Sequence, residues 1–257
     1  MHEDLQRRAQ AGDAPAACRL GTELVRCGML RSLTTETVLS EAEADLESTE
    51  REQGPASARA QGAATLRLIE QSKSCAGVTD AQLMRANHYL RQAALAGIPE
   101  AAMRYAEGQG LAMVNVVHSG MFGFLRTPDL AAWQREAVPL VEQQLRQGNA
   151  AAVLTLMSAH EADHTLFSGL VEKDPELAYQ YLILFRTLAG SKSPVVNTSL
   201  PPIAAARARD QAQRMYQDYF GGRPAQKGAF RQISPPLGDE GDGFIASCAP
   251  GHHATEN

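Results

Sequence analysis

The sequence predicts an all-α fold built from stacked helical hairpins. The chain is rich in alanine, has only 5% aromatic residues and lacks sustained β-branched runs, a composition that favours helix over strand. One pattern also recurs three times, at 5–21, 90–106 and 141–157. Repetition of a short helical pattern predicts units that stack on one another.

Each copy of the pattern has the same residue types at fixed distances from one glycine. An aliphatic residue stands seven places before the glycine, an alanine four places after it and a large residue eight places after it. Glycine readily takes the left-handed conformation that ends a helix, and small alanines let two helices approach closely. We therefore predict a helical hairpin in each copy. The positions are Leu5, Gly12, Ala16 and Leu20, then Leu90, Gly97, Ala101 and Tyr105, then Val141, Gly148, Ala152 and Leu156.

Uneven spacing between the copies predicts insertions. Residues 29–79 contain two further helices, at 35–49 and 56–73, and the first has an acidic, solvated face. A second, glycine-rich insertion at 108–128 contains Met121, Phe122 and Phe124, which either fold onto the helices or contact a partner.

A fourth, eroded copy follows the third. It begins at the Asp174–Pro175 helix start and ends at Gly190, and residues 202–219 form a terminal helix. The helical domain therefore spans 1–220. Residues 221–257 are rich in glycine and proline without hydrophobic periodicity, which predicts a mostly disordered tail. The alternative is that its few apolar residues dock and a bridge through Cys248 pins it.

Charge and hydropathy limit the classes of partner. A net charge of −5 argues against nucleic-acid binding, which needs a basic surface. The longest uncharged run, at 108–125, is interrupted by glycines and polar residues and is a poor membrane span. The residues at 1–4 lead directly into a helix, so we expect no secretory leader in this chain.

Four cysteines permit two disulfides. Cys18 and Cys27 lie on one predicted helix, about 180° apart around it and roughly 13 Å apart along it, so they cannot pair with each other. Cys27 at a helix end and Cys75 just before the next helix form a better candidate pair. Buried free thiols in a cytosolic protein are the alternative.

The sequence HEADH at 160–164 fits a zinc-hydrolase pattern. On a helix, His160 and His164 share a face and can bind Zn²⁺, while Glu161 polarises the bound water. However, the third ligand of the extended motif is absent, and the stretch lies at the polar end of the third hairpin. We interpret it as a solvated helix end, with zinc binding as the alternative.

Five aromatic residues on the repeat helices are candidate partner contacts. Large side chains in an alanine-rich fold serve mainly as core fillers, and those left exposed contribute strongly to binding. The candidates are Tyr89, Tyr105, Trp133, Tyr179 and Tyr181.

The stretch DAQLMRANHYLRQAALAGIPEAAMRYAEGQG at 80–110 resembles the Sel1-like repeat, a relative of the tetratricopeptide repeat. The resemblance implies a right-handed α-α superhelix that binds other proteins. Bacterial members are often exported and disulfide-linked, which suits a Cys27–Cys75 bridge and slightly favours a periplasmic or exported location. The long insertions depart from the regular spacing of the family, which leaves the repeat number and curvature open.

The sequence therefore predicts a non-enzymatic scaffold or adaptor without a cofactor. It would bind a protein or peptide on the concave face of the stacked hairpins. A zinc-dependent hydrolase that uses the HEADH residues is the alternative function.

Overall fold

The structure is a computed structural model of the whole chain. It describes residues 2–118, 122–161, 165–191, 200–226 and 228–230, together with Leu237 and Cys248. Every regular element among these residues is a helix, so the all-α prediction is confirmed. In chain order the α-helices are α1 (His2–Gln10), α2 (Ala14–Leu33), α3 (Glu36–Gln53), α4 (Pro55–Lys73), α5 (Asp80–Leu83), α6 (Ala86–Leu95), α7 (Pro99–Ala106), α8 (Gln109–His118), α9 (Asp129–Arg146), α10 (Ala150–Glu161), α11 (Pro175–Leu188) and α12 (Pro202–Phe220), and the 3-10 helices are η1 (Gly123–Arg126) and η2 (Phe167–Leu170).

The three repeat glycines each join two helices, as predicted. Gly12, Gly97 and Gly148 have φ values of 91°, 86° and 79°, in the region that favours glycine. They separate α1 from α2, α6 from α7 and α9 from α10, and the two helices of each pair pack against each other. The second helix of the first pair starts at a cap, because the Asp13 side chain accepts a hydrogen bond from the Ala16 backbone N–H.

The other repeat positions all lie in the core. None exposes more than 7% of its surface, so the aligned pattern marks the residues that the hairpins bury. These nine residues are Leu5, Ala16, Leu20, Leu90, Ala101, Tyr105, Val141, Ala152 and Leu156.

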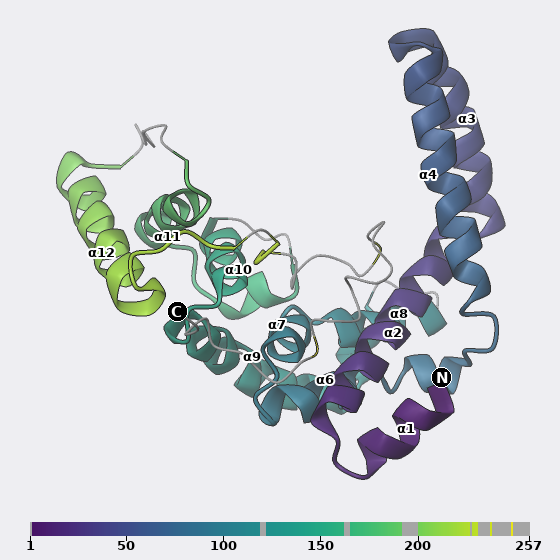
Figure 1. Cartoon of the computed structure of the whole chain (residues 1–257), viewed down its shortest axis with the longest axis horizontal. Helices are drawn as coiled ribbons and strands as arrows, with labels where there is room; N and C mark the ends of the chain where they lie inside the picture. Colours follow the sequence, from purple (N-terminus) through teal and green to yellow (C-terminus); the bar gives the residue numbers. More distant parts are fainter. Residues whose placement is uncertain are drawn as a thin grey trace.

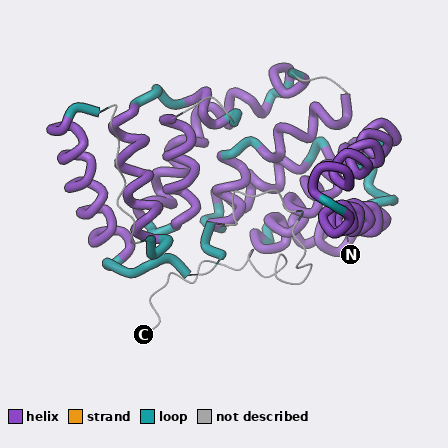
Figure 2. Tube along the Cα trace, turned by 90° about the horizontal axis from the view of Figure 1, so that it is seen from above, coloured by secondary structure: helices purple, strands orange, loops and turns teal. Residues whose placement is uncertain are grey.

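Successive helix pairs follow one another along an arc, from α1–α2 at one end to α11–α12 at the other (Figure 1). Neighbouring pairs are linked by contacts of α2 with α6, α7 with α9 and α10 with α11. Seen from above, neighbouring helices lie side by side, and the α3–α4 hairpin lies at the end near the N-terminus (Figure 2). One core cluster runs through most of these pairs and contains residues from Leu5 to Cys248.

The first insertion begins later than predicted. α2 reaches Leu33, so Cys27 lies inside the helix rather than at its end. Gly28 does not end the helix, because it makes room for the Met113 thioether of α8, which a Cβ at this position would overlap. α3 and α4 confirm the two predicted insertion helices, and Gly54, with φ 89°, separates them.

The second insertion contains a helix that the sequence did not reveal. α8 forms within the glycine-rich run, and Gly110 lets it approach the backbone of Asn87, because a Cβ there would come within 2.5 Å of the Asn87 Cα. Phe124 packs against the core, Phe122 is 64% exposed, and Met121 lies outside the described residues. Across the described part of the chain, no helix combines the length and the apolar character that crossing a bilayer requires.

Parts of the tail pack against the helical body. The Ala225 N–H donates to the Leu188 carbonyl at 2.8 Å, and the Phe230 ring meets Phe185 edge-on at a centroid distance of 4.9 Å. Cys248 is 3% exposed and forms a disulfide with Cys18. These described residues fit the alternative in which the tail docks, because apolar contacts and one bridge hold them to the helices.

Candidate functional site

The α3–α4 hairpin projects from one end of the arc and contributes nothing to the core (Figure 1). Its helices have 18 and 19 residues, and none of those residues is buried. The two helices contact each other without tight packing at Gly62, where a Cβ would lie 3.8 Å from the Leu46 side chain, an ordinary contact distance. Leu66 exposes 67% of its surface to solvent. A pair of helices with these properties displays its surface instead of supporting the fold.

The base of the hairpin is nevertheless tied to the body by a covalent bond. The Sγ atoms of Cys27 and Cys75 lie 2.00 Å apart, a disulfide between α2 and the segment after α4. Arg26 and Arg31 of α2 reach the same segment, and the Arg26 guanidinium donates to the Ser74 hydroxyl at 3.2 Å. The Arg31 guanidinium donates to the Val78 carbonyl at 2.7 Å and pairs with Asp80. These ties hold the base of an element that has little packing of its own.

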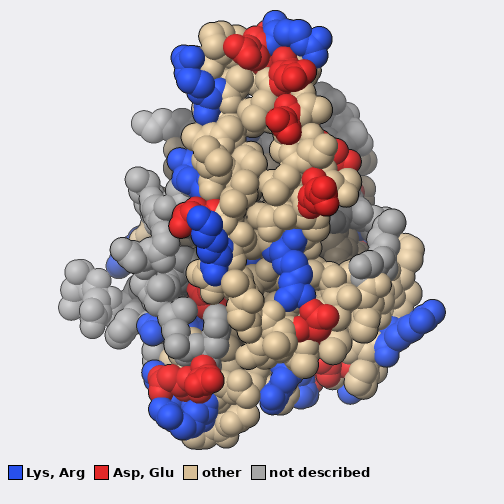
Figure 3. Space-filling view, turned by 90° about the vertical axis from the view of Figure 1, so that its right-hand side faces the viewer, with Lys and Arg blue, Asp and Glu red and all other residues tan. Residues whose placement is uncertain are grey.

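The hairpin also separates charge along its length. α3 carries seven acidic residues and one arginine, a net charge of −6, whereas α4 carries three basic residues and one acidic residue, a net charge of +2. On the projecting arm most acidic side chains gather on one side, whereas basic ones lie on the other side and at the tip (Figure 3). The seven acidic residues of α3 are all exposed: Glu36, Glu41, Glu43, Asp45, Glu47, Glu50 and Glu52.

The described HEADH residues, His160 and Glu161, form the end of α10. His160 Nδ1 lies 2.8 Å from the Glu172 carbonyl oxygen, and its ring stacks on Tyr181 at a centroid distance of 5.9 Å. Glu161 is the exposed last residue of α10, and His164 lies outside the described residues. Both observations on His160 are contacts that attach α10 to the segment that follows it.

Four of the five predicted aromatic contacts are core residues. Tyr105 is 0% exposed, and Tyr89, Trp133 and Tyr179 are each 2% exposed, so these four rings offer almost no surface to a partner. Alanine-lined helix contacts leave space that large rings fill, which is the physical reason for their burial. Tyr181 is half-buried against His160, and burial together with the nearby Glu142 carboxylate raises its pKa to about 12.

A polar network accounts for the burial of two of these rings. The indole N–H of Trp133 donates to the Tyr105 carbonyl at 2.9 Å, and the Tyr105 hydroxyl donates to Glu136 at 2.8 Å. Arg91 binds the same carboxylate through two hydrogen bonds of 2.8 and 2.6 Å. Hydrogen bonds from Arg91 lower the pKa of Glu136, and burial raises the pKa of Tyr105. The network joins α6, α7 and α9 and therefore stabilises the body.

Among the described residues, three chemically reactive side chains do meet at one point. Cys18, Glu100 and Cys248 bring their ligand atoms within 4.8 Å of one another, and all three are buried. Sequence reasoning missed this group because its members come from α2, α7 and the tail.

In comparisons with known proteins, no family model, no curated protein and no solved structure matches this chain.

Proposed function

We propose that this protein is a non-enzymatic scaffold that binds a partner protein through its α3–α4 hairpin. The supporting observation is that two long helices contain no buried residue and yet are attached to the body by a disulfide. Helices in proteins are stabilised mainly by packing an apolar face, so a helical arm without a core must be maintained by other means. A covalent tie at the base supplies part of that stability and keeps the arm's surface available.

The charge of α3 indicates the chemistry of the partner. A net charge of −6 on one exposed helix attracts a surface rich in lysine and arginine and repels acidic proteins. Leu66 supplies an apolar contact on the neighbouring helix. The proposed partner is therefore a protein with a basic face, which approaches the arm along α3.

The helix pairs of the body support the proposal of a scaffold, although they do not supply the surface that binds the partner. Three helix pairs carry the sequence pattern that resembles the Sel1-like repeat. This pattern favours a right-handed superhelix of the kind that this family forms. The aromatic residues proposed for its concave face are mostly buried, so the hairpin is the better candidate surface. Two cysteine pairs at disulfide distance favour an exported location, where such bonds persist.

Zinc hydrolysis gains no support from the described geometry. His160 is engaged with the Glu172 carbonyl and with the ring of Tyr181. Metal analysis of the purified protein and of its His160→Ala variant tests this alternative directly. If the unaltered protein binds zinc stoichiometrically and the variant does not, the hydrolase replaces the scaffold as the proposed function.

Photo-crosslinking from defined positions tests the proposed surface. A benzophenone amino acid replaces Leu66 on the hairpin or Ile203 on α12, which is 81% exposed and serves as the matched apolar control. In cells of the source organism, we expect one defined protein adduct from position 66 and none from position 203. Equal adducts from both positions, or no adduct from position 66, would reject the hairpin as the contact.

Charge reversal tests the chemistry of the partner. Glu43→Lys with Glu47→Lys reverses two exposed charges of α3, and Asp210→Lys with Asp218→Lys does the same on α12. We expect the crosslink from position 66 to fall about tenfold or more in the first variant and to stay unchanged in the second. An unchanged crosslink yield in both variants would contradict the proposal that the partner has a basic face.

A further inference from the structure

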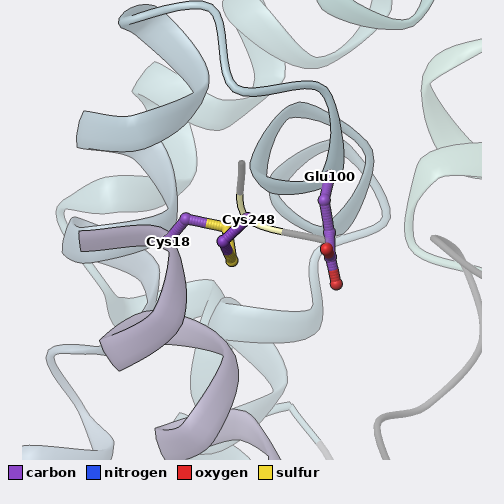
Figure 4. Close-up of side chains that lie close together, drawn as sticks. All are labelled: Cys18, Glu100 and Cys248. Carbon is purple, nitrogen blue, oxygen red and sulfur yellow. A yellow bond between two sulfur atoms is a disulfide. The ribbon is translucent and has the colours of Figure 1, made fainter. Parts of the chain in front are cut away.

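A buried carboxylate lies beside the disulfide that ties the tail to the body. Glu100 comes from α7, Cys18 from α2 and Cys248 from the C-terminal segment (Figure 4). They are 1%, 0% and 3% exposed, and their ligand atoms lie within 4.8 Å of one another. The two sulfur atoms are bonded at 2.08 Å.

One oxygen of this carboxylate is paired and the other is not. Arg104 donates from Nε and Nη2 to Glu100 Oε1, at 2.9 and 2.8 Å, and from Nη1 to Gln109 at 3.0 Å. Glu100 Oε2 has no hydrogen-bond partner and is buried. A buried polar atom without a partner costs free energy, and such atoms are rare in folded proteins. The unpaired oxygen therefore points to a ligand.

Two cysteine sulfurs and one carboxylate oxygen form a donor set that suits Zn²⁺. We propose that reduction of the Cys18–Cys248 disulfide opens a zinc site, in which Cys18 Sγ, Cys248 Sγ and Glu100 Oε2 hold the metal. In tetrahedral zinc sites, sulfur lies about 2.3 Å from the metal, so the two sulfurs must move apart to roughly 3.8 Å. The three ligand atoms already lie within 4.8 Å of one another.

The reaction is balanced with a dithiol as the reductant. The dithiol becomes a disulfide and transfers two electrons and two protons to the cysteine pair, which breaks the sulfur–sulfur bond and yields two thiols. Zn²⁺ then displaces both thiol protons, because thiolates are the ligands. Both sulfurs are buried, so the reductant reaches them through local opening of the fold.

Charge balance favours the metal over two bare thiolates. Zn²⁺ with two thiolates, the Glu100 carboxylate and the Arg104 guanidinium sums to zero, and buried sites require such compensation. The oxidised form is also neutral, because Arg104 alone balances Glu100. The same residues thus accommodate both states. In the oxidised state a disulfide joins positions 230 residues apart, and in the reduced state zinc replaces it as the crosslink.

Zinc titration of the full chain in both redox states tests the proposal. The protein is reduced with dithiothreitol, desalted under anaerobic conditions and titrated with zinc against a chromogenic chelator. We expect about one zinc per reduced chain that is absent from the oxidised chain. Cobalt, used as a spectroscopic probe, should show thiolate-to-metal charge transfer in the near ultraviolet. A reduced chain that binds no zinc would overturn the proposal.

Variants identify the ligands. Cys27→Ser with Cys75→Ser removes the other two thiols and should leave the zinc stoichiometry unchanged. Cys18→Ser should abolish binding, and Glu100→Gln should weaken it about tenfold or more while the thiolate absorption remains. Equal zinc binding by Cys18→Ser and by the unaltered reduced chain would contradict the site, as would full affinity in Glu100→Gln. If the double serine variant fails to fold, the comparison of Cys18→Ser with the unaltered chain decides.

Discussion

The contact between α2 and α6 and the contact between α3 and α4 show two ways to hold a pair of helices. A Cβ on Gly21 of α2 would lie 2.9 Å from the Leu90 side chain and 3.0 Å from its backbone nitrogen. A Cβ on Gly62 of α4 would lie 3.8 Å from Leu46, an ordinary contact distance. The body is therefore stabilised by close packing, whereas the hairpin depends on helix propensity, local polar contacts and its disulfide.

The two regions also use charge differently. In the body, Glu100 and Arg104 form an ion pair that is almost completely buried, with side-chain exposures of 1% and 2%. On the hairpin, the acidic residues of α3 face solvent. Charge in the body therefore contributes to structure, while charge on the hairpin remains available for a partner.

Removal of the buried arginine should have the largest effect. Arg104→Ala leaves the Glu100 carboxylate buried without its counter-ion, which costs about 3–5 kcal/mol. Thermal unfolding measured by circular dichroism should show a Tm lower by about 10 °C. The control is Arg207→Ala, which removes an exposed pair with Glu176 and should leave the Tm unchanged. Equal Tm values for the two variants would show that burial does not distinguish these pairs.

Removal of the hairpin tie should act locally. Cys75→Ser opens a disulfide between positions 48 residues apart, and loops of this size lose about 2–4 kcal/mol. Since α3 and α4 have no buried residues, we expect faster amide hydrogen exchange there, with little change in α6 and α7. Equal acceleration in both regions would mean that the hairpin and the body unfold together.

Two glycine substitutions should change stability in opposite directions. Gly21→Ala introduces a methyl group against the Leu90 backbone and should cost about 1–3 kcal/mol. Gly62→Ala meets no such obstacle and should stabilise the protein by about 0.5–1 kcal/mol, because alanine is the better helix former. Urea denaturation measures both values. A destabilising Gly62→Ala would show that the hairpin is packed more tightly than the structure indicates.

The half-buried carboxylate of Glu107, directly after α7, should make stability depend on pH. Burial raises the pKa of Glu107 above 4.5, although the hydrogen bond of 2.6 Å from Thr155 opposes the shift. The protonated form is favoured in the folded state, so its contribution is present at low pH and is lost as pH rises through 4.5 towards the folded pKa.

The Glu107→Gln variant keeps an oxygen acceptor for Thr155 without the charge. It should be more stable than the unaltered protein at pH 7 by about 1 kcal/mol, and the difference should vanish near pH 4. Urea denaturation at both values of pH provides the measurement. A difference that is the same at pH 4 and pH 7 would exclude the proposed cause.

Periodicity alone was enough to place most helices. The three repeat glycines, the two insertion helices and α11 follow from residue types at short range, because helix ends and amphipathic faces are local properties. The sequence does not predict α8, which lies in the glycine-rich insertion. Gly110 allows the close approach of α8 to Asn87, and that contact joins two different helices.

The candidate sites depended much more on tertiary structure. The sequence indicated the acidic face of α3, since charge and exposure can be inferred from one helix. It could not show that Tyr105 and Trp133 are buried, because their polar atoms find partners on other helices.

By itself, then, the sequence determined an all-helical chain, its repeated hairpins and an acidic insertion. The tertiary structure decided that Cys18 meets Cys248 beside Glu100, and that the insertion projects as an arm with no core of its own. The physical reason is distance along the chain. Hydrogen bonds within a helix join residues four positions apart, whereas the disulfide joins residues 230 positions apart, and only the packing of all the helices between them brings its sulfurs together.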